Sequence, residues 1–168
     1  ITSVAVTYVN SDYGKGLSDS FGKAFQALGG TVTISVPHET GKADYSAEVA
    51  SMDSAGGDAM AVFGYVNQGG PGIMQASLDS GSFDKFILAD GMYGDDLLTN
   101  VEGDLTGTFG TVPGTDSKGA ATYADMANAA GLKGSGPFTG ESYDAAALLI
   151  LAMPVSYTHL TLPTTYEV

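Results

Sequence analysis

The chain has 168 residues, which is enough for one domain of ordinary size and too few for two domains with well-buried cores. Hydrophobic residues make up 43% of the sequence, so we expect a sizeable core. There are 19 acidic residues, six lysines and no arginine, and the net charge is −13. This balance argues against binding to nucleic acid or to anionic membrane surfaces, because both need clustered basic residues.

The residue types that are missing exclude further classes of site. Without cysteine the chain has no disulfides, thiolate metal sites or cysteine nucleophiles. No apolar run reaches the roughly 18 residues of a membrane span, and the longest, Ala145 to Met153, has about half that length. We therefore expect no direct membrane insertion. The sequence starts inside a strand-like run without an initiator methionine, so we expect an interior piece of a longer protein.

The last fifteen residues differ from the rest in composition. Alanine, glycine and aspartate supply 59 of the first 153 residues and none of residues 154–168. The segment PVSYTHLTLPTTYEV resembles the adapter-derived tails of some translated metagenomic fragments, whereas the alternative is a genuine threonine-rich extension. We expect residues 154–168 to be a non-native tail and leave them out of the functional argument.

Strands and helices alternate along the first two thirds of the chain. Ser3 to Val9 is rich in β-branched residues and precedes the turn and cap residues Asn10 to Asp12, which predicts a strand followed by a helix start. One helical stripe follows, made of Leu17, Phe21, Ala24, Phe25 and Leu28. The further strands that we expect are Thr31 to Val36, stopped by Pro37, then Ala59 to Phe63, Phe86 to Ala89 and Leu105 to Val112.

Two more helices are expected between these strands. One is marked by Tyr45, Val49 and Met52, and the other begins near Pro71 and ends at Gly81. This alternation is typical of an α/β fold with a doubly wound parallel sheet. Ligands of such sheets bind beyond the carboxyl ends of the strands, so residues 10–16, 64–70 and 90–96 are the candidate loops.

After Pro113 the pattern changes to helices and glycine-rich loops. We expect helices from Ser117 to Ala130 and from Glu141 to Met153, separated by a glycine-dense loop. The second helix is apolar on nearly all sides, so it needs burial against more than one partner surface. In particular, Leu148 to Leu151 should not all be buried against the sheet of the first 112 residues.

Common catalytic and cofactor motifs are missing from the candidate loops. Gly14-Lys15-Gly16 suggests a dinucleotide turn, but its third glycine position holds Asp19, which would repel a pyrophosphate. Neither a phosphate loop nor a hydrolase elbow is found. We expect His38 to be a solvated loop residue, and Asp95 and Asp96 to cap a helix rather than hold a metal. The chain is therefore expected to have no cofactor, no metal and no enzymatic activity.

Three side chains directly follow three different strands. Tyr13 follows the first strand, Tyr65 the third and Asp90 the fourth, so they could form a pocket for a small cation with an apolar body. Structural alternatives remain open for two of them: Tyr13 could pack over its own helix, and Asp90 could cap a segment from Met92 to Leu98.

Long stretches of the sequence resemble the second lobe of type I periplasmic binding proteins, above all the branched-chain amino acid receptors of ABC transporters. The stretches are YVNSDYGKGLSDSFGKAFQALGGTV, ETGKADYSAEVASMDSAGGDAMAVFGY, FILADGMYGDD, TVPG and GPFTGESYDAAALLILA. They keep the order and spacing of the family over residues 3 to 153. The resemblance implies one lobe of a two-lobed fold that closes on its ligand.

The resemblance also implies a role for each candidate residue. Tyr13 and Tyr65 match positions whose rings contact the ligand, and Asp90 matches an acidic residue that binds the α-ammonium group. The branched-chain receptors carry glutamate at the last position, so the shorter Asp90 leaves the choice of ligand open. Residues 1–113 would be the second lobe, and residues 114–153 would cross the hinge into helices of the first lobe, which is absent.

These features favour an extracytoplasmic solute receptor that binds a small amino acid or related amide. The resemblance implies a membrane permease as partner and a periplasmic location, or a lipid-anchored one, with the signal sequence outside this piece. Two alternatives stay open: an amide or amino-acid sensor of the same fold, and an enzyme on a doubly wound sheet, because fold alone does not decide function.

Overall fold

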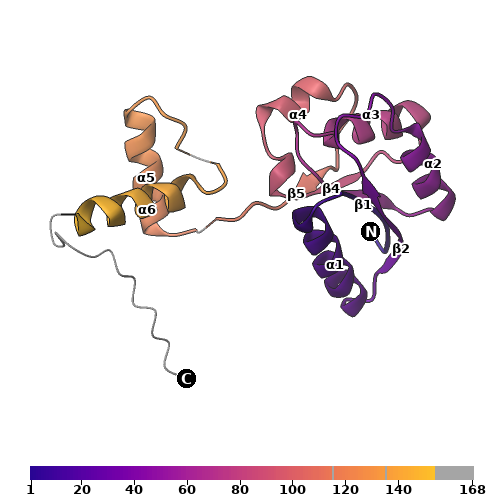
Figure 1. Cartoon of the computed structure of the whole chain (residues 1–168), viewed down its shortest axis with the longest axis horizontal. Helices are drawn as coiled ribbons and strands as arrows, with labels where there is room; N and C mark the ends of the chain where they lie inside the picture. Colours follow the sequence, from indigo (N-terminus) through magenta and orange to yellow (C-terminus); the bar gives the residue numbers. More distant parts are fainter. Residues whose placement is uncertain (115, 135, 154–168) are drawn as a thin grey trace. The chain divides into compact units, whose positions relative to one another are not determined.

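The computed structural model of the chain describes residues 1–114, 116–134 and 136–153. The chain forms two compact units, of which the first is Ile1–Val112 and the second begins at Pro113 (Figure 1). The suggested non-native tail, residues 154–168, lies outside the described residues.

The first unit is built on a five-stranded parallel sheet, which confirms the expected fold class. In the order β2-β1-β3-β4-β5, the strands are β1 (Ser3–Val9), β2 (Thr31–His38), β3 (Ala59–Phe63), β4 (Phe86–Leu88) and β5 (Phe109–Gly110). The connecting helices are α1 (Asp12–Ala27), α2 (Ser46–Ala55), α3 (Gly70–Ser80) and α4 (Asp95–Asn100), with a 3₁₀ turn, η1, at Asp90–Met92.

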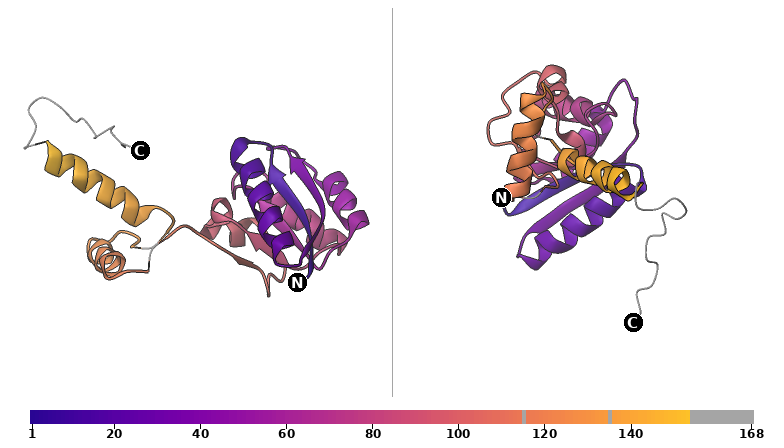
Figure 2. Two further views of the ribbon diagram at one scale, coloured as in Figure 1. Left: turned by 90° about the horizontal axis from the view of Figure 1, so that it is seen from below. Right: turned by 90° about the vertical axis from the view of Figure 1, so that its left-hand side faces the viewer.

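Helices cover both faces of this sheet (Figure 2). On one face, Val4, Val6 and Ala61 form a buried cluster onto which Phe21 and Phe25 of α1 pack. Side chains of successive strand residues point to opposite faces, so Ala5, Met60 and Val62 belong to the cluster on the other face. There they meet α2 and α3 through Val49, Met52, Ile73 and Met74. The sheet is thus doubly wound and buried on both sides.

Local signals explain where the helices start and end. The Ser11 side chain accepts a hydrogen bond from the Gly14 amide and caps α1. Pro71 lies in the first turn of α3, and Gly81 ends that helix in the left-handed conformation that glycine adopts without strain. These boundaries agree with the sequence patterns.

The second strand is longer than expected, and His38 is not solvated. β2 continues through Pro37 to His38, and the His38 side chain is fully buried. An edge strand can hold a proline whose nitrogen faces the open side, and β2 lies at the edge of the sheet. His38 Nδ1 lies 2.9 Å from the Thr7 hydroxyl on β1. Because β2 pairs with β1 as far as His38, the histidine side chain lies in the protein interior next to Thr7.

Three details of the structure differ from the sequence patterns or decide between alternatives that they left open. Leu28 ends the helical stripe in sequence but is 88% exposed, because α1 stops at Ala27 before that turn completes. β5 comprises only Phe109–Gly110 rather than Leu105 to Val112. Asp90 does not cap a helix from Met92 to Leu98; it begins the turn η1, and α4 starts after Gly94.

The second unit contains α5 (Lys118–Ala129) and α6 (Thr139–Ala152). Ser117 caps α5 by accepting a hydrogen bond from the Ala120 amide. Leu148, Leu149, Ile150 and Leu151 on α6 are 54–70% exposed, so the prediction that they are not all buried against the sheet is confirmed. No helix among the described residues is long and apolar enough to cross a membrane.

Candidate functional site

Three neighbouring strands bring the predicted site residues to one edge of the sheet. β1, β3 and β4 are adjacent and parallel, so the loops that follow them lie side by side. Tyr13 lies in the first turn of α1, Tyr65 follows β3 by two residues, and Asp90 begins η1. The structure places all three together, and each is half-buried.

The contacts among the three side chains are direct. The Tyr13 hydroxyl donates a hydrogen bond of 2.9 Å to Asp90 Oδ1, across 77 residues of sequence. The same hydroxyl accepts a hydrogen bond of 3.1 Å from the Gly91 amide. The rings of Tyr13 and Tyr65 stack with their centroids 4.8 Å apart and their planes inclined by 23°. Tyr13 therefore contacts both of the other residues rather than only its own helix.

Burial shifts the pKa of the Tyr13 phenol upward. Loss of solvent raises the pKa of Tyr13 to about 12, and the hydrogen bond to Asp90 acts in the same direction, while the Gly91 amide opposes it. A phenol with the ordinary pKa of 10 is already protonated at neutral pH, and the upward shift extends to higher pH the range in which the Tyr13 hydroxyl is a hydrogen-bond donor.

Gly91 allows the loops to approach this closely. A Cβ atom on Gly91 would lie 2.3 Å from the Gly64 carbonyl oxygen and 2.8 Å from the Tyr13 hydroxyl oxygen. The loops are also joined by a hydrogen bond of 3.0 Å from the Val66 amide to the Gly91 carbonyl. Glycine at position 91 is thus a steric requirement of the site.

Sequence reasoning missed Gly91 and His38. Gly91 contributes its amide, and its place next to Asp90 in Ala-Asp-Gly was the available signal. His38 packs behind the site, where its ring lies about 3 Å from the position of a Cβ on Gly64, directly before Tyr65. Burial lowers the pKa of His38 to about 4, and no sequence pattern indicated that burial.

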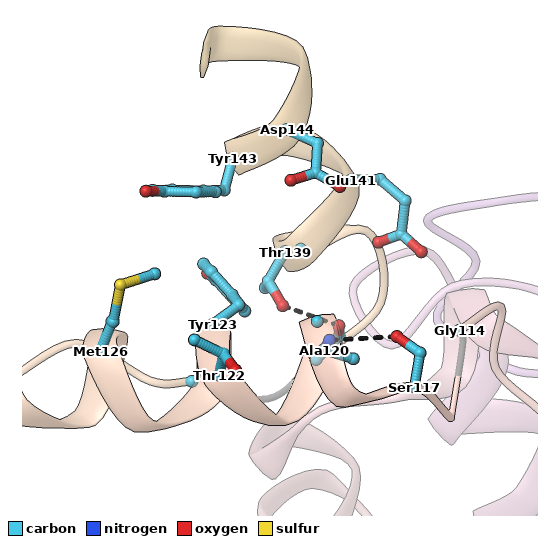
Figure 3. A pocket seen from close by; sticks show the side chains of 14 residues that line it. Gly114, Ser117, Ala120, Thr122, Tyr123, Met126, Thr139, Glu141, Tyr143 and Asp144 are labelled. Carbon is cyan, nitrogen blue, oxygen red and sulfur yellow. Dashed lines mark hydrogen bonds between the residues drawn. The ribbon is translucent and has the colours of Figure 1, made fainter. Parts of the chain in front are cut away.

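A hollow of about 480 Å³ is lined only by residues of the second unit, so none of the predicted site residues lines it. Figure 3 shows the Tyr123 ring on α5 facing Tyr143 on α6, with Glu141 and Asp144 along the same helix. The ring centroids are 5.3 Å apart. Among the described residues, no side chain that lines it forms a tyrosine–carboxylate hydrogen bond like that of Tyr13 and Asp90, so we place the candidate site at the sheet edge.

Metal chemistry finds no support in the described ranges. No group of three or more histidine, cysteine, aspartate or glutamate side chains there is arranged to hold a metal ion. The first turn of α4 contains Asp95 and Asp96, and the cap residue of that helix is Gly94. What the sheet edge offers is a carboxylate beside two aromatic rings, an arrangement suited to an organic cation.

Residues 1–160 match the protein family described as periplasmic binding protein. Among curated proteins, the chain is similar to the Leu/Ile/Val-binding protein homolog 1 of Brucella abortus, with 29% identity over 149 residues. That match covers 89% of this chain and 40% of the relative. The chain therefore spans less than half the length of this relative.

Solved structures show the same fold. The branched-chain amino acid transporter substrate-binding protein LivJ from Streptococcus pneumoniae, in complex with isoleucine, has a TM-score of 0.71 and 22% identity. The match covers 94% of this chain and 46% of that protein. The leucine-binding protein LivK from Thermotoga maritima has a TM-score of 0.74 and 24% identity, over 92% of this chain and 45% of that protein.

Proposed function

The chain belongs to the periplasmic binding protein family, and from this premise we propose that it forms one side of the ligand site of an extracytoplasmic solute receptor. The ligand is a small amino acid of the branched-chain type or a related amide. The receptor passes it to the membrane permease of an ABC transporter. The family is one of binding proteins, and we propose binding without turnover for this member too.

The observation that carries this proposal is the cluster of Tyr13, Tyr65 and Asp90. Asp90 supplies a negative charge for an ammonium group, and its half-buried position limits the screening of that charge by water. The stacked rings of Tyr13 and Tyr65 supply apolar surface beside it. An amino acid with an aliphatic side chain combines the two features that this edge accommodates.

The division of the chain supports a two-lobed receptor. In this proposal residues 1–113 are one lobe, and residues 114–153 cross a hinge and contribute helices to the other. The boundary between the two compact units, at Val112 and Pro113, agrees with this division. A single lobe makes only part of the ligand's contacts, so we expect millimolar rather than micromolar affinity from this chain alone.

NMR titration of the isotopically labelled 168-residue chain tests the proposal, because it detects binding in the millimolar range. L-leucine should shift the amide signals of Tyr13, Tyr65 and Gly91. The substitution Asp90→Asn should weaken binding by about 2–5 kcal/mol, which removes the shifts at accessible concentrations.

Asp53→Asn is the matched control. It makes the same change in charge at an exposed position on α2, so it corrects for the general attraction of cations to an acidic protein. Equal binding by the Asp90→Asn and Asp53→Asn variants would remove the ammonium role of Asp90. No shift at these amides with L-leucine would overturn the assignment of the ligand, and formation of a product from it would overturn the receptor.

A further inference from the structure

The Tyr13 hydroxyl makes two hydrogen bonds whose directions are fixed by chemistry. The Gly91 amide can only donate, so the phenol oxygen is the acceptor in the contact of 3.1 Å. The single hydroxyl proton is then left for Asp90 Oδ1 at 2.9 Å. This arrangement fixes the proton of Tyr13 as well as its oxygen.

The phenol ring has little freedom to leave this position. Tyr13 lies in the first turn of α1, directly after the cap residue Ser11 and Asp12, and its ring stacks on Tyr65. A Cβ atom on Gly91 would lie 2.8 Å from the Tyr13 hydroxyl oxygen. The backbone of η1 therefore packs directly against this hydroxyl. The Tyr13 side chain is therefore held by α1, by the loop after β3 and by η1.

Asp90 is oriented by this contact through one oxygen only. Asp90 Oδ1 accepts the hydrogen bond from the Tyr13 hydroxyl. Among the described residues, no hydrogen bond to Oδ2 is found. The second oxygen is thus left to a cationic ligand. A short carboxylate held by a phenol has a defined direction before the ligand arrives.

We propose that the Tyr13 hydroxyl is a positioning group that orients the Asp90 carboxylate for the ammonium group of the ligand, in addition to any contact that the ring makes. This inference rests on the proposed function, because it assumes that Asp90 binds a cation. Tyr13 then acts through Asp90. Gly91 contributes to the same arrangement, because its amide donates a hydrogen bond to the Tyr13 hydroxyl. Preorganisation of this kind improves affinity by reducing the ordering required on binding.

The substitution Tyr13→Phe tests the inference because it keeps the ring and removes only the hydroxyl. Two probes distinguish positioning from packing: 3-methylbutylamine, which carries the ammonium group, and 3-methylbutanol, its neutral analogue. In NMR titrations of the 168-residue chain, Tyr13→Phe should weaken binding of the amine about tenfold, the scale for a hydrogen bond to a charged group. Binding of the alcohol should stay within about twofold.

Hydrogen exchange of the Gly91 amide reports on its hydrogen bond to Tyr13 without any ligand. The Gly91 amide should exchange faster with solvent in Tyr13→Phe, because its hydrogen-bond acceptor is gone. Tyr8→Phe is the matched control: Tyr8 is a half-buried tyrosine on β1, and no hydrogen bond of its hydroxyl is found in the described part of the chain. It should leave both readouts unchanged.

The outcomes separate failure of the inference from failure of the proposed function. Equal binding of the amine by the wild-type and Tyr13→Phe proteins overturns the positioning role and leaves the receptor standing. An equal loss for the amine and the alcohol also overturns it, because the ring would then act by packing alone. If the wild-type protein binds neither probe nor L-leucine, the proposed function fails, and the inference that rests on it fails with it.

Discussion

The two units of this chain have similar kinds of residues available and bury them very differently. Among the described residues, every buried hydrophobic side chain except Ala127 lies in the first unit. There the sheet offers two faces, and each meets helices. In the second unit α6 is apolar on nearly every side, yet Leu148 and Ile150 are more than 60% exposed. Apolar residues become a core only where a second layer opposes them.

The exposed side chains of α6 fit the proposed two-lobed receptor. The four residues from Leu148 to Leu151 on α6 are all more than half exposed, and folded proteins rarely leave so many neighbouring large apolar side chains uncovered. In the proposed receptor this helix belongs to a lobe of which the described residues are only a part. The first unit, by contrast, contains the complete cluster of Tyr13, Tyr65 and Asp90.

The largest expected effect contrasts a buried residue of the first unit with an exposed residue of the second. Phe86 on β4 is fully buried, so Phe86→Ala should lower the free energy of unfolding by about 3–5 kcal/mol. Leu149 on α6 is 54% exposed, and Leu149→Ala should change it by less than about 0.5 kcal/mol. Chemical denaturation of both variants measures this, and similar losses would contradict the difference between the units.

A pair of glycines tests the same comparison at the level of the backbone. Gly91→Ala places a Cβ 2.3 Å from the Gly64 carbonyl oxygen, so it should destabilise the first unit by about 1–3 kcal/mol. Gly119→Ala lies in the first turns of α5, where the nearest atom is 3.7 Å away, and should favour that helix by up to about 1 kcal/mol. Denaturation curves followed by circular dichroism give both changes. A neutral Gly91→Ala variant would mean that the loops at the site are not tightly packed.

The smallest effect concerns pH. The pKa of His38 is about 4 in the folded chain, against an ordinary value of 6.5, because burial disfavours its charged form. The unfolded chain therefore binds the proton first, so the stability present above pH 6.5 falls as the pH drops towards 4. Between pH 6.5 and 5 the loss should be about 1.5 kcal/mol.

The variant His38→Asn should remove this part of the pH dependence. It keeps a polar group that can reach Thr7 and has no titrating ring. Measurement above pH 5 limits the contribution of the carboxylates, which titrate at lower pH. If the first unit of the wild-type protein keeps constant stability down to pH 5, His38 is more accessible to water than its burial indicates.

The sequence by itself determined most elements of the first unit and their alternation in a parallel α/β fold. Periods of two and of 3.6 residues, with cap residues such as Ser11 and Gly81, are local signals, so the alternation of strands and helices could be predicted. Parallel strands then follow from the alternation, and their carboxyl ends meet at one edge. That argument alone brings Tyr13, Tyr65 and Asp90 into one region.

Only the tertiary structure decided how those residues meet. The hydrogen bond from Tyr13 to Asp90 joins residues 77 positions apart, and it depends on β1 and β4 both lying beside β3. The burial of His38 depends on the pairing of β2 with β1, and the steric need for Gly91 depends on the approach of Gly64. Local sequence patterns do not predict such contacts, because the energy of each contact depends on which distant segments the fold brings together.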